Sequence, residues 1–258
     1  MISVILPVKN VENIIHECLT GVTWADEVLL VDGASTDKTL EIAQGFPNVK
    51  VIQHPSKDIR VLVAESEPLA KHEWIFWLCA DEIVPPELGR EIVERCAAAP
   101  ADVGGFWVPS RDILFGAKWT TGAPWPRVWR KGRAKFEFLR IHEMPKIEGK
   151  ILSMQNFYWH VNNPNLRTII PKLLRYEYID AQAASDKTCA RVNTSFWYQL
   201  TRFCYHAIKT YWPNRRLGYP AMAFAMSLAF GQLLRHLLLI EELRIRQGFT
   251  KRDTHGWG

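Results

Sequence analysis

Apolar and polar positions in the first hundred residues alternate between two patterns. Short apolar runs rich in Val, Ile and Leu predict buried strands at 2–8, 27–31, 49–53 and 74–78. Segments with apolar positions at helical spacing lie between and after them and predict helices at 11–20, 37–44, 60–72 and 87–98. The alternation of strand and helix with short links predicts the α/β fold class, with a mostly parallel sheet and helices on both faces.

Two helix boundaries in this pattern depend on single residues. Asn10 is suited to cap the helix expected at 11–20, and Asp37 to cap the one at 37–44, because both side chains accept hydrogen bonds from free backbone N–H groups. Pro68 is unfavourable within the helix expected at 60–72, because proline lacks a backbone N–H.

The pattern changes after about residue 100. Residues 104–160 carry Trp, Pro, Gly and short alternating runs, which predict a mixed extension of the sheet with loops. Residues 166–212 return to helical spacing. We therefore expect a ligand-binding α/β domain at 1–165 and a helical C-terminal extension at 166–258.

Composition supports an ordinary globular protein. Hydrophobic residues make up 48% of the 258 residues and charged residues 23%, which excludes disorder and coiled coil as the main architecture. The five cysteines are scattered and form no C-x-x-C pair, which argues against a disulfide framework or a zinc site and favours a reducing compartment. The first residues, MISVILPVKN, lack a basic region and a cleavage site, so we expect no signal peptide.

Basic charge is concentrated near the C-terminus. Residues 201–258 hold nine of the 32 basic residues but three of the 27 acidic ones. An anionic surface is the partner that such a segment favours, and we expect a membrane rather than nucleic acid. The alternative is a solvated helix face.

Residues 219–240, YPAMAFAMSLAFGQLLRHLLLI, lie within that basic region and are uncharged up to Leu234. A spanning helix needs about 20 apolar residues, so the segment is borderline for crossing a bilayer. Its interruption by Arg235 and His236 favours a helix at the membrane interface or packed on the body. We therefore expect a cytoplasmic protein, peripheral or monotopic on the inner face of the membrane, with Trp212, Tyr219 and Trp257 suited to the headgroup level.

Candidate chemistry lies at the ends of the predicted strands, where open parallel sheets bind ligands. Residues 7–10, 32–35 and 79–82 follow three of these strands, and the last two segments are acidic. Carboxylates suit a hard divalent cation or sugar and ribose hydroxyls. Neither G-x-G-x-x-G nor G-x-x-x-x-G-K-[ST] occurs, which argues against dinucleotide redox chemistry and P-loop phosphoryl transfer.

The pieces VILPVKN, EVLLVDGASTDKT and WIFWLCADE, followed by WPRVWR at 125–130 and His142-Glu143, resemble the family 2 inverting glycosyltransferases. The likeness covers roughly residues 1–165 and is greatest to the lipopolysaccharide core β-1,4-glucosyltransferase type. It implies a GT-A (Rossmann-like) fold. It also implies transfer of a sugar from a nucleotide-diphosphate donor, UDP-linked, to a hydroxyl of a lipid-linked or cell-surface glycan such as lipopolysaccharide core. The alternatives are a polyprenyl-phosphate acceptor and a catalytically inactive protein that binds nucleotide sugars or acts as a scaffold.

The resemblance assigns the donor site to the strand ends. It implies that Asp32 bonds the base or ribose, although a turn residue is the alternative, and that Pro7 and Asn10 shape the nucleoside pocket. Asp81, next to Ala80, matches the last aspartate of the family's D-x-D motif, which holds Mg²⁺ or Mn²⁺ against the diphosphate. The first aspartate of that motif is Cys79 here. A thiol is a poor ligand for Mg²⁺, so either Asp81 suffices, Glu82 assists, or metal dependence is weak.

Glu143 matches the family's general base, which takes the proton of the attacking hydroxyl. His142 beside it is expected to orient the site, the alternative being a surface pair in a loop. Asp112, after a possible strand, is a weaker candidate for the base.

Three further basic side chains and one histidine complete the predicted site. Arg127 and Arg130 suit the diphosphate, because a guanidinium matches phosphate oxygens, or else form a solvent-facing pair. His160 is expected to reach the metal or the diphosphate, or else to be structural. Arg60 corresponds loosely to an arginine that the family often places near the nucleotide.

Overall fold

A computed structural model describes residues 1–258 except 57, 120–122, 138–143, 163–164, 186–194 and 247–258. The chain divides into two compact units. The first, which we call the sheet unit, comprises Met1–Asp112 and Lys118–Asn162. The second, the helical unit, comprises Ile113–Ala117 and Asn163–Gly258. The unit boundary near residue 163 lies close to the one expected at 165, and the short insertion of 113–117 was not expected.

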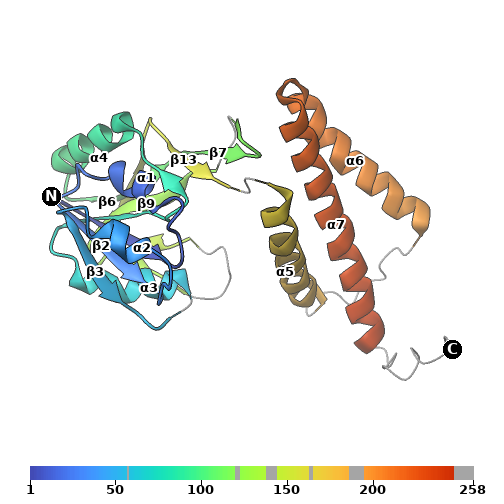
Figure 1. Cartoon of the computed structure of the whole chain (residues 1–258), viewed down its shortest axis with the longest axis horizontal. Coiled ribbons are helices and arrows are strands. Elements are labelled where there is room, and N and C mark those ends of the chain that lie inside the picture. Colours follow the sequence, from blue (N-terminus) through green and yellow to red (C-terminus); the bar gives the residue numbers. More distant parts are fainter. Residues whose placement is uncertain (57, 120–122, 138–143, 163–164, 186–194, 247–258) are drawn as a thin grey trace. The chain divides into compact units, whose positions relative to one another are not determined.

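The sheet unit is built on a seven-stranded sheet (Figure 1). In spatial order its strands are β12 (Lys150–Ser153), β6 (Val103–Val108), β9 (Trp125–Arg130), β4 (Trp74–Trp77), β1 (Ile2–Val8), β2 (Glu27–Asp32) and β3 (Val49–Gln53). Strands β4, β1, β2 and β3 run parallel, β12 runs parallel to β6, and β9 is antiparallel to both of its neighbours. The predicted α/β class with a mostly parallel sheet is confirmed.

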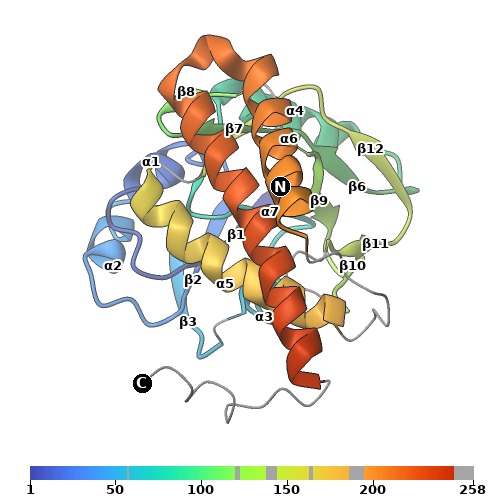
Figure 2. The ribbon, with the colours of Figure 1, turned by 90° about the vertical axis from the view of Figure 1, so that its right-hand side faces the viewer.

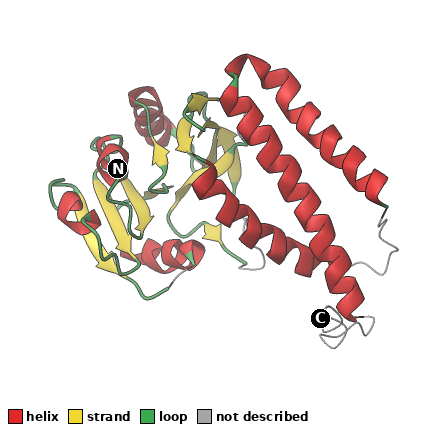
Figure 3. Cartoon of the chain, turned by 45° about the vertical axis from the view of Figure 1, so that its right-hand side comes forward, coloured by secondary structure: helices red, strands yellow, loops and turns green. Residues whose placement is uncertain are grey.

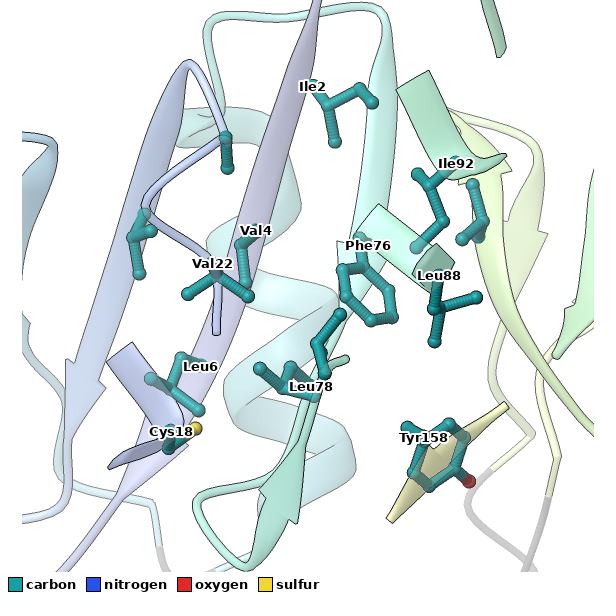
Figure 4. Close-up of a cluster of buried hydrophobic side chains, with 14 of the residues drawn as sticks. Ile2, Val4, Leu6, Cys18, Val22, Phe76, Leu78, Leu88, Ile92 and Tyr158 are labelled. Atoms are coloured by element: carbon teal, nitrogen blue, oxygen red, sulfur yellow. The ribbon is translucent and has the colours of Figure 1, made fainter. Parts of the chain in front are cut away.

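Helices cover both faces of this sheet, as the continuous apolar runs of its strands require. On one face lie α1 (Ile15–Thr20), α2 (Thr39–Ala43) and α4 (Pro86–Ala98), which pack on the even-numbered positions of β1. In Figure 4 Val4 lies near Val22, Leu6 near Cys18, and Phe76 near Leu88. On the other face α3 (Ile59–Ser66) packs against Ile5.

Three predicted helices are shorter than expected, and the one at 37–44 is confined to Thr39–Ala43. The helix at 11–20 begins at Ile15, and Asn10 is not its cap, because Asn10 adopts a left-handed conformation with φ 51° and accepts a hydrogen bond from another loop. The helix at 60–72 ends at Ser66 and is followed by the 3₁₀ turn η1 (Glu67–Leu69). Pro68 is the second residue of this turn, where a backbone N–H donor is not needed.

The segment 104–160, predicted as a mixed extension of the sheet, supplies β6, β9 and β12 of the main sheet and most of two smaller sheets. One pairs β10 (Ala134–Lys135) with β11 (Lys146–Ile147). The other has the order β5 (Glu82–Ile83), β13 (Tyr158–Val161), β7 (Ser110–Leu114) and β8 (Ala117–Lys118). The antiparallel pairing of β13 with β5 sets His160 opposite Glu82.

The helical unit consists of α5 (Leu166–Ser185), α6 (Phe196–Asn214) and α7 (Tyr219–Arg246), with the 3₁₀ turn η2 (Arg215–Leu217) between the last two. Helix α7 packs against both α5 and α6, and lies between them in Figures 1 and 3. Figure 2 shows α7 along its length with α6 beside it. The apolar segment predicted at 219–240 is therefore part of a longer helix.

Candidate functional site

The carboxyl ends of β2, β1 and β4 meet at one edge of the seven-stranded sheet. Val8 pairs with Asp32 in the parallel register, and Ile5 pairs with Trp77. Adjacent strands lie about 4.8 Å apart, so β2 and β4 are separated by about 10 Å across the sheet, with β1 between them. The structure thus brings together the three segments that the sequence singled out.

Asp32 ends β2 and is held in a tight turn. Its carboxylate accepts hydrogen bonds from the Ser35 backbone N–H at 3.1 Å and from Ser35 Oγ at 2.5 Å. Only 1% of Asp32 is exposed. The turn interpretation therefore has direct support, and a nucleoside contact would use an oxygen already engaged with Ser35.

The loops after β1 and β2 are bound to each other by reciprocal hydrogen bonds. The Asn10 backbone N–H donates to Ser35 Oγ at 3.0 Å, and the Thr36 N–H donates to Asn10 Oδ1 at 2.8 Å. Asp37 accepts from the Thr39 N–H at 3.0 Å, at the start of α2, and from the Glu12 N–H at 3.1 Å. Asn10 and Asp37 thus brace the loops that border the strand ends.

Asp81 lies on a compact turn beyond β4. The Glu82 N–H donates to the Cys79 carbonyl at 3.0 Å, and the Cys79 N–H donates to Glu82 Oε2 at 2.8 Å. The Val161 N–H on β13 donates to the Asp81 carbonyl at 2.7 Å. The backbone of Asp81 is fixed on two sides, while its side chain is 48% exposed.

A buried arginine supports this turn from behind. Arg127 on β9 forms an ion pair with Glu82, and both side chains are almost fully buried. The Arg127 guanidinium also lies 4.6 Å from the Trp77 ring centroid, and its Nε approaches the Tyr158 hydroxyl at 3.4 Å. The Arg127 guanidinium is thus engaged by Glu82 inside the protein, and its predicted contact with the diphosphate stays a prediction.

Burial and charge determine the protonation of this cluster. Burial raises the pKa of Glu82, and Arg127 opposes that rise. Burial lowers the pKa of Arg127, but Glu82 outweighs it and raises the pKa above the ordinary arginine value. Burial, with the nearby Glu82 carboxylate, also raises the pKa of Cys79 far above neutrality. Cys79 therefore carries a protonated thiol, which is unsuited to bind a hard cation.

His160 joins two carboxylates at the exposed edge of the cluster. Its Nε2 lies 3.3 Å from Asp81 Oδ2, and its Nδ1 lies 3.0 Å from Asp112 Oδ1. Burial lowers the pKa of His160, but the hydrogen bonds to Asp112 and Asp81 outweigh it and raise the pKa to about 9. His160 is therefore a cation at neutral pH in the protein without metal.

Two of these groups fit a divalent cation. Asp81 offers a half-exposed carboxylate, and Nε2 of His160 faces it, while Asp112 fixes the imidazole through Nδ1 in the manner of outer-shell carboxylates. Among the residues that the structure describes, no group of three or more His, Cys, Asp or Glu could hold a metal ion. A cation here would take its remaining ligands from water or a bound diphosphate, and His160 would lose its Nε2 proton.

Of the remaining predicted site residues, Pro7 and Ala80 lie at the carboxyl ends of the strands, and Arg60 lies on α3. Pro7 is buried in β1 opposite Val31, and Ala80 is buried next to Asp81. Arg60 lies in the first turn of α3 and binds Asp58, with Nε to Oδ1 at 3.0 Å.

Arg130 lies at the opposite edge of the sheet. It is paired in register with Trp74 at the start of β4. Its guanidinium donates to the Val103 and Ala99 carbonyls and forms an ion pair with Glu73. Arg127 lies three residues earlier in β9, beside the carboxyl end of β4, so the two arginines are at different levels of the sheet; the predicted contact of Arg130 with the diphosphate stays a prediction.

The candidate base Glu143 and its neighbour His142 lie outside the described residues. The alternative base, Asp112, is engaged with His160. Sequence reasoning did not connect Asp112 with His160, nor Glu82 with Arg127. Both contacts depend on strand pairings between distant segments. The one signal in the sequence was that Asp112 follows a possible strand, which marked it as a candidate site residue but did not reveal its partner.

Comparisons with known proteins agree with this fold. The family model described as Glycosyl transferase family 2 matches residues 3–146. A PGL/p-HBAD biosynthesis glycosyltransferase of Mycobacterium tuberculosis is 40% identical over 91 residues, which are 32% of this chain and 36% of the relative. An uncharacterized glycosyltransferase of Rickettsia bellii is 36% identical over 92 residues, 35% of this chain and 31% of the relative. The match thus spans about a third of the length of these curated relatives.

A solved structure shares the fold. S. aureus TarS 1–349 in complex with UDP-GlcNAc aligns with a TM-score of 0.50 at 17% identity, over 70% of this chain and 65% of that one. At this identity the likeness concerns the fold alone.

Proposed function

Because the chain belongs to glycosyl transferase family 2, whose model matches more than half of it, we propose that it transfers a sugar from a nucleotide-diphosphate donor to an acceptor hydroxyl with inversion. We propose UDP as the nucleotide. The observation that carries the proposal is the half-exposed Asp81, held at the carboxyl ends of parallel strands with His160 Nε2 3.3 Å away. Ligands of open parallel sheets bind at this edge.

In this mechanism the donor lies across the edge formed by β2, β1 and β4. The braced loops at Asn10 and Asp32 border the nucleoside, and Asp81 with His160 would hold a divalent cation beside the diphosphate. Such a cation, when bound, stabilises negative charge on the departing diphosphate as a Lewis acid. Asp112 keeps the His160 ring oriented, and the Cys79–Glu82 turn fixes the position of Asp81.

Inverting transfer also needs a carboxylate that accepts the acceptor's proton on the face opposite the leaving group. We assign this role to Glu143, on its resemblance to the family's base. Asp112 is less suited, because its Oδ1 already bonds His160 Nδ1.

We propose a glycan or lipid-linked glycan as the acceptor, reached at the inner face of the cytoplasmic membrane. Lipopolysaccharide core and polyprenyl phosphate are the two acceptor types that the resemblance suggests. The support is helix α7, which by length and composition could cross a membrane. An enzyme that modifies a lipid-anchored molecule gains from being held at the same surface.

A second candidate function is a nucleotide-sugar binding protein without transferase activity. Cys79 is the observation that favours it, because the position of the family's first acidic ligand here carries a protonated thiol. A measurement of donor turnover distinguishes the two functions, because a binding protein would hold the nucleotide sugar without transferring its sugar.

A thermal-shift panel of UDP-, GDP- and dTDP-sugars, with and without Mn²⁺, tests donor binding, since a ligand of the native state raises the melting temperature. Release of nucleoside diphosphate then measures turnover for the wild type, Asp81→Asn, Glu143→Gln and the control Glu94→Gln on α4. We expect UDP-sugars with Mn²⁺ to raise the melting temperature, Asp81→Asn to abolish that rise, and Glu143→Gln to slow turnover about 10²- to 10⁴-fold.

Three outcomes would contradict the proposal. The donor site is refuted if no nucleotide sugar stabilises the wild type, or if Asp81→Asn responds like Glu94→Gln. Stabilisation by UDP-sugars without turnover on any glycan or lipid acceptor would favour the inactive binding protein.

A further inference from the structure

Helix α6 has its apolar side outward and its polar side inward. Gln199 is 8% exposed, and Arg202 on the same side contacts His236 of α7 at 3.3 Å. The opposite side of the helix is mainly apolar and aromatic, and its exposed residues include Trp197, Leu200, Cys204, Tyr205, Ile208, Tyr211 and Trp212, with Thr201 among them. A helix on a soluble domain shows the reverse arrangement.

Helix α7 also has its large apolar side chains outward. Its buried positions are small residues, namely Ala221, Ala223, Ala225, Ser227, Ala229 and Gly231. Its exposed positions include large apolar side chains at helical spacing, namely Tyr219, Met222, Met226, Phe230 and Leu237. A Cβ at Gly231 would lie 3.0 Å from both Leu173 and Glu177 of α5. Close approach through small residues is how helices pack in lipid, where apolar burial between helices contributes little.

Charged groups lie between the helices of this unit. Arg235 of α7 forms ion pairs with Glu177 and Asp180 of α5, and the Glu177 side chain is only 7% exposed. Charged residues inside a helical bundle and large apolar residues outside are the distribution of a protein whose solvent is hydrocarbon.

We propose that α6 and α7 insert as a helical hairpin into a lipid bilayer, with the outward faces of both helices against the acyl chains. In the most apolar 18-residue window of α7 only 28% of residues are buried within the chain, whereas a core helix of a soluble protein is mostly buried. A single docked partner would cover one face, but apolar residues face outward on both helices. The site at the strand ends is not needed for this insertion; only its link to a lipid-anchored acceptor rests on the proposed function.

The dimensions and charges of the hairpin suit this location. Residues 219–234 are uncharged, and these sixteen residues rise about 24 Å along a helix, against about 30 Å of bilayer hydrocarbon. The turn between the helices carries Arg215 and Arg216, whose charges complement anionic lipid phosphates. Trp212 and Tyr219 flank that turn, where aromatic side chains favour the headgroup region.

Flotation of the full-length chain with vesicles tests the insertion. Vesicles of phosphatidylcholine alone, and with phosphatidylglycerol, are compared at low salt and at about 1 M salt, where the Debye length is about 3 Å. We expect flotation with both vesicle types at both salt concentrations, because apolar burial is not screened. The variant Trp197→Glu with Ile208→Glu should reduce the floating fraction at least about tenfold, since charge on a lipid-facing helix is unfavourable.

A matched control and a milder variant guard against misfolding. Val93→Glu places one such carboxylate at an exposed apolar position of α4, 45% exposed, and should float like the wild type. Trp197→Ala with Ile208→Ala removes apolar area without adding charge and should give an intermediate loss. Circular dichroism in detergent checks that each variant keeps its helices, and the UDP-sugar thermal shift, measured separately, reports on the donor site.

Three results would overturn the inference. Flotation confined to anionic vesicles at low salt would mean electrostatic attachment at the surface. Equal flotation of the double-Glu variant and the wild type would place the lipid contact elsewhere. Failure to float, together with a dimer that light scattering detects in the wild type and not in the double-Glu variant, would identify a second copy of the chain as the occupant.

Discussion

Replacing Arg127 by Met tests whether the buried ion pair supports the Asp81 turn. The variant keeps an unbranched apolar stem but removes the guanidinium, and it leaves the Glu82 carboxylate buried, 3% exposed, without its counter-charge. Removing one partner of a buried pair typically costs about 3–5 kcal/mol, whereas replacing both by uncharged groups is often close to neutral. We therefore expect Arg127→Met to lose about 3–5 kcal/mol of unfolding free energy, and Arg127→Met with Glu82→Gln to recover part of that loss.

The loss should depend on pH in a defined direction. Burial raises the pKa of Glu82, and the variant removes Arg127, the influence that opposes that rise. A carboxyl whose pKa is higher in the folded than in the unfolded state binds more protons when folded, so stability falls as pH rises above the unfolded value of about 4.5. The difference in stability between Arg127→Met and wild type should therefore be smaller at about pH 5 than at pH 8.

Urea unfolding at the two pH values measures these free energies, and Mn²⁺-dependent UDP-sugar stabilisation of the same proteins reports on the turn. We expect Arg127→Met to weaken that stabilisation, because the Glu82 carboxylate that it leaves unpaired also holds the turn through the Cys79 N–H. The reasoning fails if Arg127→Met unfolds like the wild type, or if adding Glu82→Gln restores no stability at pH 8.

Two further predictions concern packing and protonation. Gly104→Ala should lower the unfolding free energy, measured in urea, by about 1–3 kcal/mol, because its Cβ would overlap the Glu148 carbonyl. The control Gly45→Ala should lose far less stability, because its Cβ would meet only the Ile42 carbonyl oxygen at 3.3 Å. Equal losses in the two variants would contradict this packing argument. In EDTA, the pairing of His160 with Asp81 and Asp112 should add on the order of 1–2 kcal/mol to the unfolding free energy of the wild type, after allowance for the exposed Asp81. This contribution should be complete below about pH 6.5 and be lost as pH rises through about 9. His160→Gln should abolish this pH dependence.

The sequence predicted strands β1, β2 and β4 well because they are buried on both faces. Continuous apolar runs placed the strands within a residue or two of the observed ones, as with 27–31 against Glu27–Asp32. Helix boundaries were less accurate, because local competitors decided them. Pro68 ended α3 early, and Asn10 used its side chain to hold the neighbouring loop instead of capping α1.

The site was predicted only where it depends on local order along the chain. The strand ends that carry Asp32 and Asp81 follow from the alternation of elements and the parallel sheet. The ion pair of Arg127 does not, because β9 runs antiparallel beside β4, and this pairing of distant segments brings Arg127 to Glu82. The contact between His160 and Asp112 likewise needs the pairing of distant strands.

The replacement of an acidic ligand by Cys79 fits the cluster around it. The Cys79 thiol lies 3.8 Å from Arg127 Nη1, and the Glu82 carboxylate already engages that guanidinium. A second carboxylate at position 79 would share one arginine with Glu82 and repel it, since like charges at close range disfavour ionisation of both. The uncharged thiol avoids this repulsion, but it leaves a bound cation with one fewer oxygen ligand. A cation at this edge would therefore depend on Asp81 and on His160, whose Nε2 faces it from β13.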